Sequence, residues 1–90
     1  MDIVEEKYQR FKAFLKPHIT DTAHQMALSS APLEVFLQSL AQYKDMDPEN
    51  ITKKISAAFN VNLSEYDIRD IEKLYRYLSY FIEVAKASGY

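Results

Sequence analysis

The residues of this chain best suited to catalysis or metal binding are two histidines with an aspartate between them: His18, Asp21 and His24. On one straight helix the two histidines would lie about 9 Å apart along the axis and about 120° apart around it. A zinc ion holds nitrogen ligands at about 2.0–2.1 Å, so these two side chains could not share one. Asp21 and His24 are the true helix neighbours. We therefore interpret the group as a polar surface in which Asp21 caps a helix.

An acidic loop is the second place where an ion could bind. It contains Asp45, Asp47 and Glu49. An EF-hand needs a glycine at its sixth position and a bidentate glutamate at its twelfth, whereas counting from Asp45 those positions hold Asn50 and Ser56. We therefore expect a capped turn here and no metal ion.

The remaining catalytic and cofactor motifs cannot be formed by this composition. The chain has no cysteine and a single glycine, Gly89. Thiol catalysis, a phosphate-binding P-loop and the glycine pattern of a dinucleotide site are therefore excluded. The sequence predicts a protein that is not an enzyme and has no cofactor.

One segment with a histidine resembles a known phosphoacceptor motif. Residues 23–33 read A-H-Q-M-A-L-S-S-A-P-L, and the fitting positions are Ala23, His24, Met26 and Ser29 or Ser30. The run resembles the A-H-x-L-K-G-x-S segment of histidine phosphotransfer domains, which are four-helix bundles. The resemblance implies His24 as the phosphoacceptor. Ala27 and Leu28 depart from the family, which has there a lysine that helps to hold the phosphate and a glycine that gives access to the histidine.

Length and charge limit the class of protein further. Ninety residues, 48% of them hydrophobic and 27% charged, indicate one folded domain over residues 1–90. The net charge is −2, and no segment is strongly basic, so the charge distribution argues against a nucleic-acid partner. No apolar run approaches the ~20 residues that span a bilayer, so we expect no membrane partner. The acidic start differs from a secretory signal, which predicts a cytoplasmic protein.

Apolar spacing and helix-breaking residues predict five helices. Only one glycine and three prolines occur, which favours a few long elements over many strands. Proline at positions 17 and 48 marks one helix end and one helix start. The expected helices cover residues 2–16, 20–28, 32–44, 48–59 and 64–88.

The last helix is the centre of the expected fold. Ser64 and Asp67 have the spacing of a capping box, and Glu72 and Arg76 have that of an ion pair one turn apart. We predict an all-α fold, an irregular or orthogonal bundle of four to five helices around this C-terminal helix, with the first and third helices as its main partners. The predicted core residues are Phe11, Leu15, Phe36, Leu40, Ile55, Phe59, Ile71, Leu74, Leu78 and Phe81.

A second apolar flank of the last helix suggests the function. It carries Tyr66, Tyr77, Tyr80 and Val84, and tyrosines are frequent interface anchors. We predict a non-enzymatic protein–protein interaction module, a small regulatory, inhibitory or adaptor protein. Its partner is expected to be another protein or a second copy, as a homodimer formed through the C-terminal helix. Burial of the same flank in the chain's own core is the competing interpretation, and it is favoured by the tendency of a small bundle to centre on its longest, most apolar helix.

A DNA-binding regulator is the remaining alternative. Helices 48–59 and 64–88 could form a helix-turn-helix, with Ala57 or Ala58, Val61 and Ile68 at the packing positions. The second of these helices begins with acidic residues, which would meet phosphates with like charge.

Overall fold

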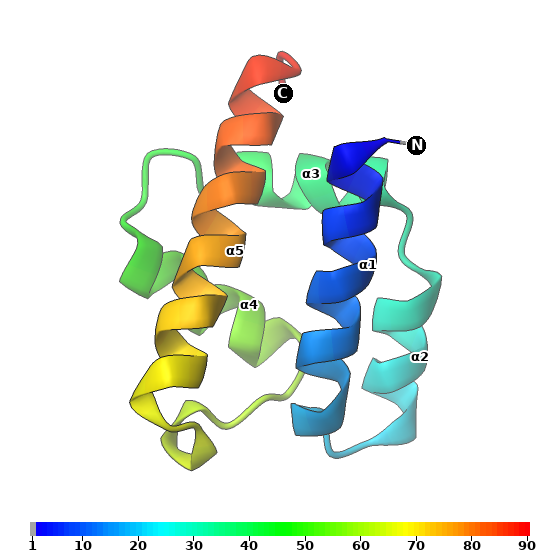
Figure 1. Cartoon of the computed structure of the whole chain (residues 1–90), viewed down its shortest axis with the longest axis vertical. Helices are drawn as coiled ribbons and strands as arrows, with labels where there is room; N and C mark the ends of the chain where they lie inside the picture. Colours follow the sequence, from blue (N-terminus) through cyan, green and yellow to red (C-terminus); the bar gives the residue numbers. More distant parts are fainter. Residues whose placement is uncertain (1) are drawn as a thin grey trace.

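The computed structural model describes residues 2–90, and within that range it contains α-helices, two short 3-10 helices and no strand (Figure 1). The elements are α1 (Ile3–Leu15), η1 (Lys16–His18), α2 (Thr22–Ser30), α3 (Leu33–Ala41), α4 (Pro48–Ala58), η2 (Leu63–Glu65) and α5 (Ile68–Ala87). The all-α prediction is confirmed, as is the long C-terminal helix.

Aspartates determine where most of the helices begin. In four α-helices the residue before the first turn is an aspartate whose carboxylate accepts a backbone N–H: Asp2, Asp21, Asp47 and Asp67. A carboxylate at this position satisfies a free backbone donor and complements the helix dipole. The exception, α3, follows Pro32 and has no side-chain cap.

The start of the last helix differs from the prediction. The helix begins at Ile68, and Ser64 lies in η2 instead. Asn62 is the reason, because its side-chain oxygen accepts hydrogen bonds from the backbone and hydroxyl of Ser64. Tyr66 then has an extended backbone, and Asp67 caps α5. The predicted capping box of Ser64 and Asp67 is therefore wrong, because Asp67 is itself the cap of α5.

Two other boundaries move for similar local reasons. The second helix covers Thr22–Ser30, later than expected, because the carboxylate of Asp21 caps it. The third ends at Ala41, short of Lys44, because the chain then passes through a series of turns toward α4.

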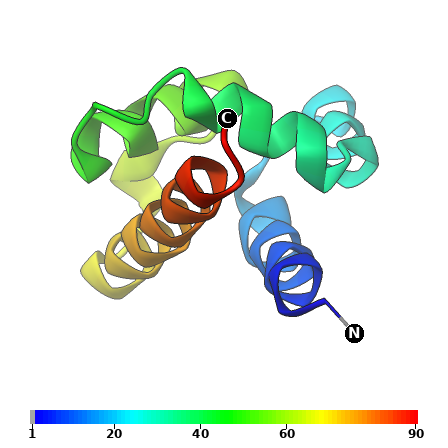
Figure 2. The same cartoon turned by 90° about the horizontal axis from the view of Figure 1, so that it is seen from above.

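The helices form two layers. In Figure 1, α1 and α5 lie side by side at the front, and α3 and α4 lie behind them. Figure 2 shows α2 and α3 on the same side of α1 and α5 as α4. The backbones of α3 and α4 approach that of α5 most closely. The predicted packing partner α3 is confirmed, whereas α1 stands farther from α5 and reaches it through large aromatic side chains.

The core lies between these layers. Eight of the ten predicted core residues are buried, and the other two, Phe59 and Ile71, are half-buried. Phe59 is the C-cap residue that follows α4, and Ile71 lies in the first turn of α5, so fewer neighbouring elements cover them. Buried residues outside the prediction include Tyr8, Ile19, Leu28, Leu37, Ile51, Val61 and Ile82.

Candidate functional site

A groove runs between α1 and α5 on the front face of the molecule. Its main hollow has a volume of about 230 Å³ and is lined by Lys7, Lys73, Arg76 and Tyr77. The two helices that form it lie next to each other in Figures 1 and 2. We call this feature the α1–α5 groove.

A smaller hollow extends the groove along α1. Its volume is about 130 Å³, and its lining residues are Ile3, Glu6, Lys7 and Arg10. Lys7 lines both hollows, so they lie next to each other. Ile3 is 74% exposed and adds an apolar rim at this end.

Aromatic rings form the floor of the groove and fill the space between the two helices. The ring of Tyr77 lies 5.5 Å from that of Phe11 and 5.8 Å from that of Phe14, measured between centroids. The ring of Phe81 lies 5.6 Å from Phe11 and 5.2 Å from Tyr80. Offset and edge-on pairs at these distances are favourable beyond the area that they bury. The floor is therefore a packed part of the core with partly exposed edges.

Two lysines lie over these rings. The ammonium nitrogen of Lys7 is 4.3 Å from the ring centroid of Tyr80, and that of Lys73 is 4.9 Å from the ring centroid of Phe14. Each contact joins a cation on one helix to a ring on the other. Such cation–π contacts contribute about 0.5–1 kcal/mol at exposed positions. They hold both charges at the mouth of the groove.

The groove carries more positive charge than its own carboxylates neutralise. Among the described residues, no carboxylate lies within ion-pair distance of Lys7, Lys73 or Arg76. The expected pair between Glu72 and Arg76 is not formed. A surface pair of this kind is worth only a few tenths of a kcal/mol, and Arg76 lines the hollow instead.

The structure divides the predicted tyrosine flank. Tyr66 is only 8% exposed, and its ring lies edge-on to that of His18 at 4.1 Å. Burial, followed by the nearby charge of Asp70, raises the pKa of Tyr66 to about 12. Tyr66 is therefore covered within the chain. The other three members of the flank are half-buried: Tyr77, Tyr80 and Val84.

The residues of the groove that sequence reasoning missed are its cations. Lys73, Tyr77 and Tyr80 are spaced four and three residues apart, so they share one face of α5. That spacing could have identified Lys73. Nothing in the sequence pattern places Lys7, which is distant in the chain, opposite them.

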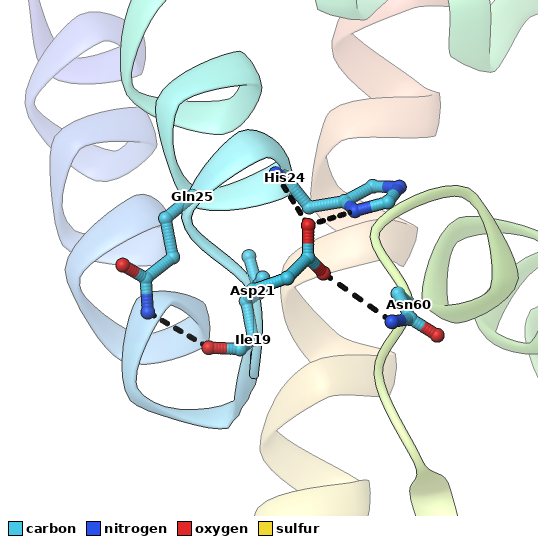
Figure 3. A network of polar contacts seen from close by, with 5 residues as sticks. All are labelled: Ile19, Asp21, His24, Gln25 and Asn60. Carbon is cyan, nitrogen blue, oxygen red and sulfur yellow. Dashed lines mark hydrogen bonds and ion pairs between the residues drawn. The ribbon is translucent and has the colours of Figure 1, made fainter.

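His24 takes part in a separate polar network at the start of α2 (Figure 3). One carboxylate oxygen of Asp21 accepts hydrogen bonds from the backbone N–H of His24, at 3.0 Å, and from its ring nitrogen Nδ1. The other oxygen accepts from the side chain of Asn60 at 3.3 Å. These bonds, led by that of the His24 ring, lower the pKa of Asp21 to about 2. The network joins the start of α2 to the end of α4.

This arrangement gives His24 a capping environment. Figure 3 shows its second ring nitrogen, Nε2, pointing away from Asp21. His24 lies in the first turn of a nine-residue helix, and Ala27 and Leu28 replace the lysine and glycine that the phosphotransfer motif supplies. The contacts of this region therefore support a role in stabilising the start of α2 more than a role in phosphotransfer.

The positions of the suggested helix-turn-helix are also mostly on the surface. Ala57 and Ala58 are exposed, and Ile68 is 72% exposed. Val61 is buried, but it forms an isolated β-bridge with Ile19. The packing contacts that would hold a DNA-reading helix at a fixed angle are thus missing at three of these positions.

Other classes of site find no support in the described part of the chain. Over residues 2–90, no three histidine or carboxylate side chains gather closely enough to hold a metal ion. No helix in that range has both the length and the apolar character that crossing a membrane requires. No family model, curated protein or solved structure matches this chain.

A separate hollow of about 220 Å³ is lined by residues of α4, α5 and the loop before α4, and it includes both Lys86 and the carboxylate of Glu83. The α1–α5 groove differs from it in having three cations without a carboxylate partner among the described residues.

Proposed function

We propose that this protein is a non-enzymatic interaction module, a small regulatory, inhibitory or adaptor protein, that binds another protein through the α1–α5 groove. The observation that supports this proposal is the combination of half-buried tyrosine rings with three cations that have no carboxylate partner. Aromatic and arginine side chains are enriched at the centres of protein interfaces.

The size of the hollow supports a protein partner rather than a small-molecule ligand. Ligand pockets usually enclose about 300–1,000 Å³ and bury most of the ligand. The main hollow holds about 230 Å³, and three of its four lining residues are exposed: Lys7, Lys73 and Arg76. An open hollow of this size suits one or two side chains that project from a larger partner.

A second copy of this chain fits the groove less well. A two-fold dimer would bring the same surface of each copy together. The cations Lys7, Lys73 and Arg76 of both copies would then lie in one interface, and like charges without intervening carboxylates repel. We therefore favour a different protein over a homodimer formed through this face of α5.

Site-specific photo-cross-linking in the native host tests the proposal. Tyr80, at the edge of the groove, is replaced by p-benzoylphenylalanine, and cross-linked products are identified by mass spectrometry. We expect a defined partner that is not captured from the matched position Met26, which is exposed on α2.

Charge reversal in the same experiment shows whether the groove carries the binding. The double substitution Lys73→Glu with Arg76→Glu should abolish the cross-link. The matched pair Lys53→Glu with Lys54→Glu, exposed on α4, should preserve it. Equal capture from Met26, or no effect of reversal in the groove, would refute the proposal.

A further inference from the structure

We infer that the segment of the partner that occupies the α1–α5 groove is acidic and inserts one aromatic or large aliphatic side chain beside Tyr77. This inference rests on the proposed function and adds the chemistry of the ligand. It follows from the charges at the rim of the groove and from the composition of its floor.

The charge at the rim is local and uncompensated. Of the residues that line the two hollows, four are basic and one, Glu6, is acidic. Glu6 is already bound by Arg10, with 2.9 Å between the nitrogen and the oxygen. This leaves Lys7, Lys73 and Arg76 facing the groove in a protein whose net charge is −2. A partner segment with carboxylates would find complementary charge here and repulsion over much of the remaining surface.

The floor beneath these charges is apolar and aromatic. Tyr77 lines the main hollow, and its ring packs against Phe11 and Phe14 below. Lys73 lies within 6.0 Å of the centroid of Tyr77 and 4.9 Å of that of Phe14. A side chain that enters between the cations therefore meets ring surface, which favours an apolar anchor flanked by carboxylates.

The smaller hollow accommodates only a short segment of a ligand. Ile3 and Arg10, at the two ends of the smaller hollow, are separated by about 10 Å along α1. About three extended residues or two helical turns cover such a distance. The contact is therefore a short motif within a larger protein.

A nucleic-acid strand fits these observations less well. Single-stranded nucleic acids bind along a positively charged track, with bases stacked on aromatic side chains. Here the lining of the two hollows includes the carboxylate of Glu6, and the exposed Glu72 directly precedes Lys73 on α5. These carboxylates would repel a phosphate backbone that continued past the groove.

Titration of the ¹⁵N-labelled protein with synthetic peptides, followed by NMR at low salt, tests the inference. The probe is a short peptide with glutamates on both sides of a phenylalanine. The matched peptides have glutamine in place of each glutamate, or serine in place of the phenylalanine. A single-stranded oligothymidine is the nucleic-acid probe.

We expect saturable shifts of the amide signals of Lys7, Lys73 and Tyr77 with the acidic phenylalanine peptide. The glutamine peptide should bind several-fold more weakly, and so should the serine peptide. The Lys73→Glu/Arg76→Glu protein should lose the shifts, whereas the Lys53→Glu/Lys54→Glu protein should keep them. Unchanged circular dichroism would show that the loss is not caused by unfolding.

Equal binding of the acidic and glutamine peptides, shifts outside the groove, or preference for the oligothymidine would each overturn the inference. The cross-linking experiment separates this failure from failure of the proposed function. A partner captured at Tyr80 through a segment without carboxylates leaves the function standing and refutes its acidic ligand. Absence of any groove-dependent partner refutes the proposed function itself.

Discussion

Lys7 on α1 covers the ring of Tyr80 on α5, with its ammonium nitrogen 4.3 Å from the ring centroid. A second contact runs in the opposite direction, because Lys73 on α5 lies over the ring of Phe14 on α1. The two helices are thus joined by reciprocal cation–π contacts above a floor of packed rings. The same contacts position the charges of the α1–α5 groove, so the stability of this helix pair and the shape of the proposed binding surface depend on each other.

The aromatic floor predicts a large effect of truncating Phe11. Its ring is fully buried and contacts Phe36, Tyr77 and Phe81. Phe11→Ala should lower the free energy of unfolding by about 3–5 kcal/mol, because it removes buried apolar surface and leaves a cavity between α1 and α5. Urea denaturation followed by circular dichroism measures this change. Ile3→Ala, at an exposed position of the same helix, should cost little, and equal losses in both variants would contradict the role of the floor.

The two buried tyrosines Tyr8 and Tyr66 predict different effects on stability when the hydroxyl is removed. The hydroxyl of Tyr8 donates a hydrogen bond to the carbonyl of Ala31 at 2.8 Å, whereas that of Tyr66 is buried without a partner among the described residues. Tyr8→Phe should therefore destabilise the protein by about 0.5–1.5 kcal/mol, and Tyr66→Phe should be neutral or stabilising. Thermal and urea unfolding of the two variants gives a direct comparison. A substantial loss in Tyr66→Phe would mean that its hydroxyl has a partner in solution.

The corrected start of α5 predicts which residue acts as its cap. Asp67 accepts the backbone N–H of Asp70 at 2.9 Å, and Ser64 lies outside the helix. Asp67→Ala should cost about 1 kcal/mol of stability, within the range usual for the loss of a helix cap. Ser64→Ala removes only an exposed local bond to Asn62 and should cost less. Equilibrium unfolding of both variants distinguishes a helix capped by Asp67 from one capped by Ser64. A larger loss of stability in Ser64→Ala than in Asp67→Ala would support the start at Ser64 that the sequence predicted.

The Asp21 network predicts a dependence of stability on acid. In the folded protein the pKa of Asp21 is lowered from 3.8 to about 2, first by the hydrogen bond from His24. A lowered pKa in the folded protein means that the unfolded chain binds the proton of Asp21 more readily. The ionised Asp21 carboxylate therefore stabilises the fold above about pH 4, and this contribution is lost as the pH falls toward about 2. The melting temperature of Asp21→Asn should therefore fall less than that of the wild type between about pH 4 and about pH 2.

The control for this experiment is Asp45→Asn, a substitution at an exposed aspartate in the loop before α4. Its melting temperature should follow the wild-type dependence on pH. Identical acid profiles of wild type and Asp21→Asn would show that the carboxylate of Asp21 is not coupled to folding.

The sequence by itself determined the helical class and most of the buried stripe of the last helix. Leu74, Leu78 and Phe81 recur at helical spacing, and a residue on such a stripe is buried whichever element covers it. Asp47 with Pro48 likewise marked the start of α4, because a cap acts only on the first turn that follows it. Local signals of this kind depend on neighbours in the chain and can be read without the fold.

Only the tertiary structure decided which face of α5 remains open. Tyr66 and Tyr77 belong to the same predicted flank, yet Tyr66 precedes α5 and packs against His18, whereas Tyr77 lies on α5 and lines the groove. That difference depends on where α5 begins, and the placement of Lys7 and Lys73 around one hollow depends on where α1 lies. The distance between α1 and α5 is set by the bulk of the rings between them, and contacts between such distant segments leave no periodic trace in either helix.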